Sequence, residues 1–171
     1  CAKCASEIFT KTNRRWRYAF TNCTHCGPRH TITRHIPYDR AQTSMAVFPM
    51  CPVCRAEYEN PADRRFHAQP NACPVCGPKL TLTDNKGIVI MVDAIAGTLK
   101  VILTGGIAAV KGLGGSHLVS DARNSRAVTR LRERKGRSEK PLAVICAPTE
   151  SASDLVRLSA AGGKARSSDA R

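Results

Sequence analysis

The sequence has few aromatic residues and no long uninterrupted apolar run, and these absences restrict the classes of protein to which it can belong. Only 5% of its 171 residues are aromatic. Its longest mainly apolar stretch, residues 87–110, is broken by Asp93, Lys100 and several glycines, so it is too interrupted to span a bilayer. No charged start followed by an apolar segment marks a secretory signal. The sequence therefore predicts a soluble, cytoplasmic protein.

Cysteine, by contrast, is abundant and regularly placed. Eight of the nine cysteines form four Cys-x-x-Cys pairs, and 18 residues separate Cys4 from Cys23 and again Cys54 from Cys73. The second copy of this frame follows the first at an offset of 50 residues. Disulfides would suit a secreted chain, but an odd number of cysteines grouped in close pairs favours metal ligation.

Zinc is the metal that this frame favours, because Zn²⁺ prefers four tetrahedral ligands and binds thiolates well. Four thiolates leave no open position, so each site is predicted to be structural rather than catalytic. The simplest pairing keeps each ion within one copy of the frame, although a crossed pairing between the copies stays open at this point. The predicted ligands are Cys1, Cys4, Cys23 and Cys26 for one ion and Cys51, Cys54, Cys73 and Cys76 for the other.

Other residues near these pairs receive other roles. Gly27 and Gly77 directly follow the last cysteine of each copy, where a tight turn would let backbone N–H groups face the thiolates. The ninth thiol, Cys146, is predicted to be buried and inert. With both four-sulfur sets complete, the neighbouring histidines are not expected to bind metal; they are His25, His30, His35 and His67.

The change in composition along the chain predicts a small, irregular, metal-stabilised zinc-finger module followed by a partial α/β domain. The cysteine-rich part has too little apolar content to form a good core alone, so metal would have to replace one. The predicted division is a first finger at 1–26, a linker at 27–50, a second finger at 51–76, a linker at 77–92 and the α/β part at 93–171.

The second half alternates helical and strand patterns. Asp93 is placed to cap a helix over residues 94–103 that Gly105 and Gly106 end. The remaining predicted elements are a buried strand at 107–110, a glycine-rich loop KGLGGSH, a helix from Asn124 or Ser125 to about Gly136, a buried strand at 142–146 and a third helix from Thr149. Two strands are too few to close such a domain, so the chain is expected to be a piece of a longer protein.

Acidic residues are scarce, and the formal net charge is +14. Eight thiolates and two Zn²⁺ would change this by −8 + 4 = −4, to about +10. Residues 1–76 carry 11 basic and five acidic side chains, so they would be near +2 once metallated. A zinc-ribbon module that binds nucleic acid is the alternative function, with Trp16, Tyr18, Phe20 and Phe66 beside Arg14, Arg15, Arg64 and Arg65 as its candidate surface. The near-neutral fingers make its electrostatic footprint weak.

A basic segment, RLRERKGRSEK, suggests a phosphate site. Lys135 and Arg137 flank Gly136, where the helix should stop, and positive side chains in such a loop can hold phosphates. The KGLGG loop offers backbone N–H groups for the same purpose, although it matches neither the P-loop nor the Rossmann fingerprint. A solvated helix face is the favoured reading of Arg130, Arg132 and Arg134.

The amino-acid sequences of three stretches resemble those of one protein family. They are NRRWRYAFTNCTHCGPRHTIT, the long middle segment IPYDRAQTSMAVFPMCPVCRAEYENPADRRFHAQPNACPVCGP, and VKGLGGSHLVSDARN with LRERKGRSEKPLAVI. The chain resembles the HypF family, the carbamoyltransferases of nickel–iron hydrogenase maturation. The resemblance implies two C4 zinc fingers followed by the opening of a YrdC-like domain, with the acylphosphatase-like and C-terminal nucleotide-binding domains missing.

The resemblance also implies an activity. The family uses carbamoyl phosphate and ATP to make carbamoyl-adenylate, and passes the carbamoyl group to the C-terminal cysteine of a partner, HypE. That group becomes a cyanide ligand of the hydrogenase. The segment with Lys135, Arg137 and Lys140 resembles the K-x-R element that contacts nucleotide and acyl phosphate, but the later S-x-N element is absent, and Ser116 replaces a usual aromatic residue. The fragment alone is therefore expected to be inactive, and the fingers are expected to fix how the domains sit.

Overall fold

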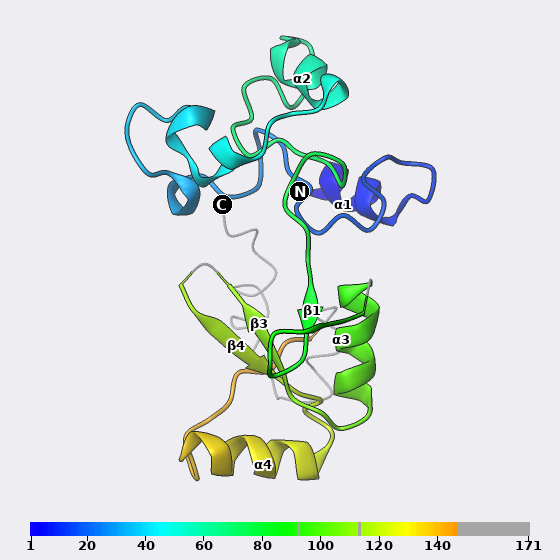
Figure 1. The fold of residues 1–171 in the computed structure, drawn as a ribbon, viewed down its shortest axis with the longest axis vertical. Helices are drawn as coiled ribbons and strands as arrows, with labels where there is room; N and C mark the ends of the chain where they lie inside the picture. The colour runs from blue at the N-terminus through cyan, green and yellow to red at the C-terminus, as the bar shows by residue number, and fades with distance from the viewer. Residues whose placement is uncertain (92, 113, 147–171) are drawn as a thin grey trace, which may run out of the picture. The chain divides into compact units, whose positions relative to one another are not determined.

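The structure is a computed structural model that describes residues 1–91, 93–112 and 114–146. The chain divides into two compact units (Figure 1). Of the described residues, the first unit holds those in 1–98 and 112–115, and the second holds those in 99–111 and 116–146. Within the described part of the chain, no helix is long and apolar enough to cross a membrane.

The cysteine-rich unit is built from two copies of one motif. Helices α1 (Ala2–Phe9) and α2 (Pro52–Glu59) each begin just after the first cysteine of a copy. Pro52 suits the first turn of α2 because its missing N–H has no partner there in any helix. A tight turn with a left-handed residue follows each helix: the N–H of Arg17 bonds to the carbonyl of Ile8 at 2.8 Å, and the N–H of His67 to that of Tyr58 at 3.0 Å.

The segment between the two copies contributes to a small core. It contains three short 3₁₀ turns, η1 (His30–Ile32), η2 (Arg40–Gln42) and η3 (Ser44–Val47). Ile32 and Met45 from this segment pack with Tyr18 and Ala72, which come from the first and second copies. The core is thus a few residues drawn from both copies, and fits the expected small, irregular and metal-dependent module.

After the second copy the chain forms a short antiparallel hairpin and a capped helix. Strand β1 (Leu82–Thr83) pairs with β2 (Val89–Met91). Helix α3 (Ala94–Leu103) follows, and Asp93 Oδ1 accepts from the N–H groups of Ile95 and Ala96, as the sequence predicted. Gly97 lies so close to β1 and β2 that an added Cβ would stand 2.5 Å from a Leu82 methyl carbon.

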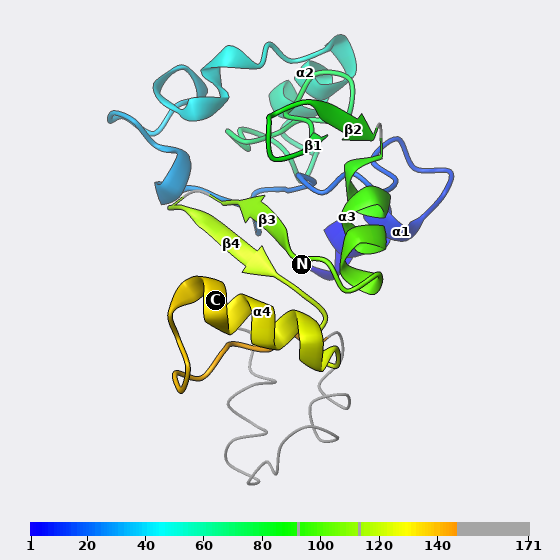
Figure 2. The same cartoon turned by 60° about the horizontal axis from the view of Figure 1, so that its bottom comes forward.

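The second unit contains a hairpin and a basic helix. Strand β3 (Ala108–Lys111) pairs antiparallel with β4 (Ser116–Val119), from Ala108 opposite Val119 to Lys111 opposite Ser116 (Figure 2). Helix α4 (Ser125–Lys135) is capped by Asn124, whose Oδ1 accepts from the N–H of Ala127 at 3.0 Å. It ends at Gly136, which is left-handed with φ of 58°. Both helix boundaries were predicted from the sequence.

Three expectations for this unit need correction. The predicted loop KGLGGSH is part of a hairpin, because Lys111, Ser116 and His117 are residues of its two strands. Strand β3 has one buried residue rather than being buried throughout. Residues 142–146 form no strand, and Ile145 is 92% exposed, because none of the strands in the described residues pairs with them. The helix predicted from Thr149 lies outside the described residues.

Candidate metal centres

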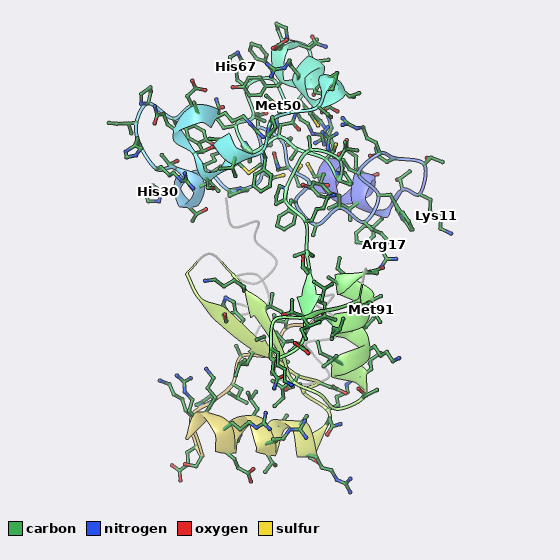
Figure 3. The ribbon with its side chains drawn as sticks, viewed as in Figure 1. Lys11, Arg17, His30, Met50, His67 and Met91 are labelled. Carbon is green, nitrogen blue, oxygen red and sulfur yellow. The ribbon has the colours of Figure 1, made fainter. Side chains whose placement is uncertain are left out.

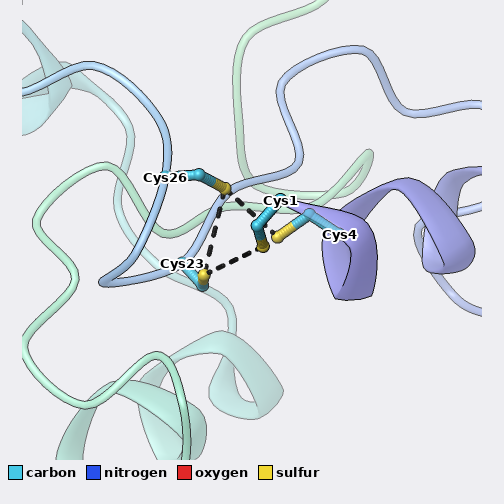
Figure 4. Close-up of side chains that lie close together, drawn as sticks. All are labelled: Cys1, Cys4, Cys23 and Cys26. Atoms are coloured by element: carbon cyan, nitrogen blue, oxygen red, sulfur yellow. Dashed lines mark hydrogen bonds between the residues drawn. The ribbon is translucent and has the colours of Figure 1, made fainter. Parts of the chain in front are cut away.

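The first four cysteines converge through their side chains (Figure 4). Cys1 and Cys4 come from the start of α1, and Cys23 and Cys26 from a tight knuckle closed by a backbone bridge. The sulfur of Cys1 lies 3.8 Å from that of Cys23, Cys23 lies 3.9 Å from Cys26, and Cys26 lies 3.5 Å from Cys4.

The second copy repeats this arrangement. The sulfur of Cys73 lies 3.8 Å from those of Cys51 and Cys76, and Cys54 completes the group. In each group all four sulfurs lie within 4.8 Å of one another. The structure therefore gathers the sulfurs within each copy rather than between copies.

These separations fit a tetrahedral zinc site. Four sulfurs about 2.3 Å from a central Zn²⁺ lie about 3.8 Å from one another, which follows from the geometry of a tetrahedron. A disulfide would need sulfurs about 2.05 Å apart, and all nine cysteines are free. Each group has a donor set of four soft thiolates with none to spare, so the residues fit a closed, structural zinc ion.

Backbone amides favour the thiolate form in both knuckles. The N–H of His25 donates to the sulfur of Cys23 at 3.4 Å. Burial raises the pKa of the Cys73 thiol, but N–H groups of Cys76 and Val75 outweigh it and bring that pKa down to about 6. A thiol that ionises readily is a better zinc ligand at neutral pH.

Neither of the two glycines that follow the knuckles has room for a side chain. An added Cβ at Gly27 would stand 2.6 Å from Asn22 Cβ, and one at Gly77 would stand 2.5 Å from Ala72 Cβ and 2.2 Å from Tyr18 Oη. Gly27 also has φ of 103°, so the predicted tight turn requires a glycine there for its backbone as well. The same sequence position thus meets the same crowding in both copies, and only the first copy adds a left-handed backbone.

Each sulfur group also receives an arginine from the other copy. Arg14 donates to the sulfur of Cys54 at 3.1 Å and to that of Cys51 at 3.5 Å. In return, Arg64 donates to the sulfur of Cys4 at 3.1 Å. Burial lowers the pKa of Arg14, but the hydrogen bond and the charge of Cys54 raise it above its ordinary value. These guanidinium contacts were not predicted.

The histidines and the ninth cysteine lie outside both groups. The sets of converging metal-binding side chains found among the described residues contain cysteines alone. The ring of His67 packs edge-on against Phe66 with centroids 4.3 Å apart, and His30 lies elsewhere, on η1 (Figure 3). Cys146 is partly exposed rather than buried, and the described residues before it, 142–145, form no strand.

Lys135, Arg137 and Lys140 lie at and beyond the end of α4, and all three are exposed. Arg132 organises this stretch: its Nη1 donates to the carbonyls of Arg137, Ser138 and Lys140 at 3.3, 3.2 and 2.9 Å. Arg132 was expected to face solvent only. Its contacts fold the chain back along the last turns of α4.

The candidate nucleic-acid surface is largely used up inside the cysteine-rich unit. Arg15 and Arg65 are 1% and 3% exposed, and both pair with carboxylates. Arg14 and Arg64 are engaged by sulfur and by Glu57 and Glu7, respectively. Arg15 and Arg65 therefore have no free face for phosphates, whereas Arg14 and Arg64 keep 30% and 21% of their side chains exposed, which leaves only a reduced surface for that alternative.

The sequence did contain a signal for these arginine contacts, although they were not predicted. The pair Arg14 and Arg15 recurs as Arg64 and Arg65 at the same 50-residue offset as the cysteines, and Glu7 recurs as Glu57. Burial raises the pKa of Glu57, but the hydrogen bond from Arg15 and the nearby arginine charges bring it down to about 2.

Comparison with known proteins agrees with this geometry. The HypF finger family matches residues 1–33 and 50–83, and the Sua5, YciO and YrdC family, described as telomere recombination, matches residues 100–169. Carbamoyltransferase HypF of Rhodobacter capsulatus is 55% identical over 145 residues, which is 85% of this chain and 19% of that protein. The chain belongs to the HypF family. The family predicted from the sequence is thus confirmed.

Other HypF proteins are similar over the same region. Probable carbamoyltransferase HypF of Methanocaldococcus jannaschii is 49% identical over 146 residues, 85% of this chain and 19% of that protein. HypF of T. kodakarensis superposes with a TM-score of 0.92 at 43% identity, over 98% of this chain and 22% of that one. Full-length HypF in its phosphate- and nucleotide-bound form gives 0.87 at 44% identity, over 96% and 21%.

The chain thus spans about a fifth of the length of the HypF proteins that it matches. Two four-cysteine clusters and part of a YrdC-like domain are present, as the sequence predicted.

Proposed function

We propose that the chain is the paired-finger segment and the opening of the YrdC-like domain of a carbamoyltransferase that matures nickel–iron hydrogenases. The observation that carries the proposal is 55% identity to a protein named carbamoyltransferase HypF over 85% of this chain. In the whole protein, carbamoyl phosphate, water and ATP would give carbamoyl-adenylate, phosphate and pyrophosphate. The sulfur of the C-terminal cysteine of a HypE-type partner would then take the carbamoyl group, lose its proton and release AMP.

In this proposal the eight paired cysteines hold two structural zinc ions. Bound zinc supplies cross-links that take the place of a hydrophobic core. The small core in the described structure supports this role, because it consists of Tyr18, Ile32, Met45 and Ala72 with Phe48 packed against it. The fingers would act as a rigid piece that fixes the positions of the domains on either side. The proposed boundaries are 1–26 for the first finger, 51–76 for the second finger and 93–171 for the YrdC-like part.

Lys135, Arg137 and Lys140 are the proposed contacts to nucleotide and acyl phosphate. Support comes from Arg132, which donates to the carbonyls of Arg137, Ser138 and Lys140 and so limits where the side chains of Arg137 and Lys140 can reach. Three positive charges on a held loop attract a phosphate chain. The isolated chain is expected not to catalyse the reaction, because most of the length of its relatives is missing from it.

A chimera tests the proposal. Residues 1–171 would replace the matching segment of the Rhodobacter capsulatus protein, and pyrophosphate release would be measured with ATP, with and without carbamoyl phosphate. We expect carbamoyl-phosphate-dependent release, about 10²-fold weaker when Arg137→Gln and Lys135→Gln are combined. Arg134→Gln is the control, because it removes an exposed arginine from the same helix.

The chimera also has a contrary outcome. A folded chimera with two bound zinc ions but no carbamoyl-phosphate-dependent activity would show that this segment does not serve such an enzyme. Salt-dependent binding of single-stranded RNA to the chain would instead favour the nucleic-acid module.

A further inference from the structure

The two copies of the finger motif exchange the same set of contacts in both directions. Arg14 donates to the sulfur of Cys54, and Arg64, its counterpart 50 residues later, donates to the sulfur of Cys4, both at 3.1 Å. Neither arginine contacts a cysteine of its own copy among these bonds. The two sulfur groups are therefore each completed by a side chain from the other copy.

Buried ion pairs cross between the copies in the same way. Arg15 Nη2 lies 2.5 Å from Glu57 Oε2, and Arg65 pairs with Glu7. The Nε of Arg15 donates to the carbonyl of Ala72 at 2.9 Å, and that of Arg65 to the carbonyl of Asn22 at 3.0 Å. Both carbonyls belong to the residue just before a ligand cysteine, so each arginine also holds the knuckle of the other copy.

The negative charge of a four-thiolate zinc site explains why an arginine contact to its sulfurs would strengthen metal binding. A zinc ion with four thiolates carries a net charge of −2, and a guanidinium that donates to a thiolate offsets part of it. Partners of this kind orient metal ligands, and their removal typically lowers metal affinity about 10- to 100-fold. Here the partner of each site is positioned by the fold of the other copy, and that fold itself depends on metal.

We infer that the two sites form one cooperative metal-binding unit, in which Arg14 and Arg64 couple zinc binding at one site to zinc binding at the other. Loading either site orders the arginine that completes its neighbour. The coupling is reciprocal, so each site raises the affinity of the other by the same factor. This inference depends on the zinc occupancy proposed above.

Release of zinc to a chelator can be followed separately at the two sites. The 171-residue chain, loaded with zinc, would be exposed to a chelator and N-ethylmaleimide, and the modified cysteines would be identified by mass spectrometry over time. We expect the eight paired cysteines to become modified in a single phase. Arg14→Gln, which leaves every ligand in place, should accelerate modification of Cys51, Cys54, Cys73 and Cys76 about 10-fold or more. Cys1, Cys4, Cys23 and Cys26 should follow in the same phase, and Arg64→Gln should give the mirror result.

A second pair of variants measures the coupling directly. Cys23→Ser with Cys26→Ser disables the first site, and Cys73→Ser with Cys76→Ser disables the second. Competition with a chelator should show the remaining site weakened about 10-fold or more in both, by equal factors. Arg55→Gln is the matched control: Arg55 neighbours Cys54 in the sequence but pairs with Glu59 in an exposed position, so release should be unchanged.

The outcomes separate two failures. The coupling alone would be overturned if the wild-type chain binds two zinc ions but the sites act independently. In that case each arginine variant would change the modification rate only in the cysteine group that it contacts. Each site would also keep its zinc affinity after the other site is disabled. Absence of zinc from the wild-type chain would overturn the metal proposal itself, and the coupling with it.

Discussion

Arg15 and Glu57 lie 42 residues apart in the sequence, yet Nη2 of the arginine is 2.5 Å from Oε2 of the glutamate. The guanidinium is almost fully buried, and it also donates to the Ala72 carbonyl and to Asn71. A buried charge whose three nitrogens all donate makes a strict geometric demand. The pair therefore fixes how the first copy of the motif meets the second.

Glu57→Ala should destabilise the zinc-loaded chain by about 3–5 kcal/mol, because it leaves the buried guanidinium of Arg15 without its counter-ion. Urea unfolding followed by the fluorescence of Trp16, the single tryptophan, measures the change. The pKa of Glu57 is lowered from 4.5 to about 2, so its contribution is present above pH 4.5 and is lost as the pH falls towards 2. The free energy of unfolding lost in Glu57→Ala should therefore be constant across the neutral pH range.

Glu59→Ala is the control for that variant. Glu59 is on the same helix, but its side chain is 61% exposed and pairs with Arg55 at 3.5 Å. An exposed pair of this kind contributes under about 1 kcal/mol. Equal losses for the two glutamates would contradict the role given to the Arg15–Glu57 pair.

Gly77→Ala should destabilise the same unit by about 1–3 kcal/mol, because its methyl group would overlap Tyr18 and Ala72 in a core with few other residues. The same unfolding measurement applies. Gly114→Ala is the control, since an added Cβ there meets nothing within 4 Å. A Gly77→Ala chain as stable as the parent would show that Tyr18 moves aside without cost.

Local signals in the sequence predicted the helix ends and the cysteine frame. Asp93, Asn124 and Gly136 act within three or four residues of themselves, so their neighbours in the sequence were enough to read them. Cysteine spacing is similarly informative, because the metal chemistry requires pairs at short range.

Contacts between distant residues could not be read in this way. Arg14 reaches a sulfur 40 residues away, and nothing in its local sequence names that partner. Residues 142–146 carry the apolar pattern of a buried strand, but a strand also needs neighbours, and the described chain provides none for them. The 50-residue repeat of the arginine pairs was the one available clue to the exchange.

Arg132→Gln should loosen the backbone that carries Arg137 and Lys140, because three carbonyls lose their shared donor. Limited trypsin digestion should cut after Arg137 several-fold faster in the variant. Arg134→Gln, at an exposed position of the same helix, should leave that rate unchanged. If both variants were cut alike, the hydrogen bonds of Arg132 would not restrain the segment.

Metal removal should unfold the cysteine-rich copies while leaving α4 protected. Helices α1 and α2 are eight residues each, too short to persist alone, and each starts at a predicted ligand. Helix α4 has its own cap at Asn124 and buries Ala127 and Leu131. Hydrogen exchange of the wild-type chain with and without a chelator would compare these amides, and added zinc should restore protection of α1 and α2 together. Protection that survives a verified loss of metal would mean that the buried arginine pairs, rather than zinc, hold the two copies folded.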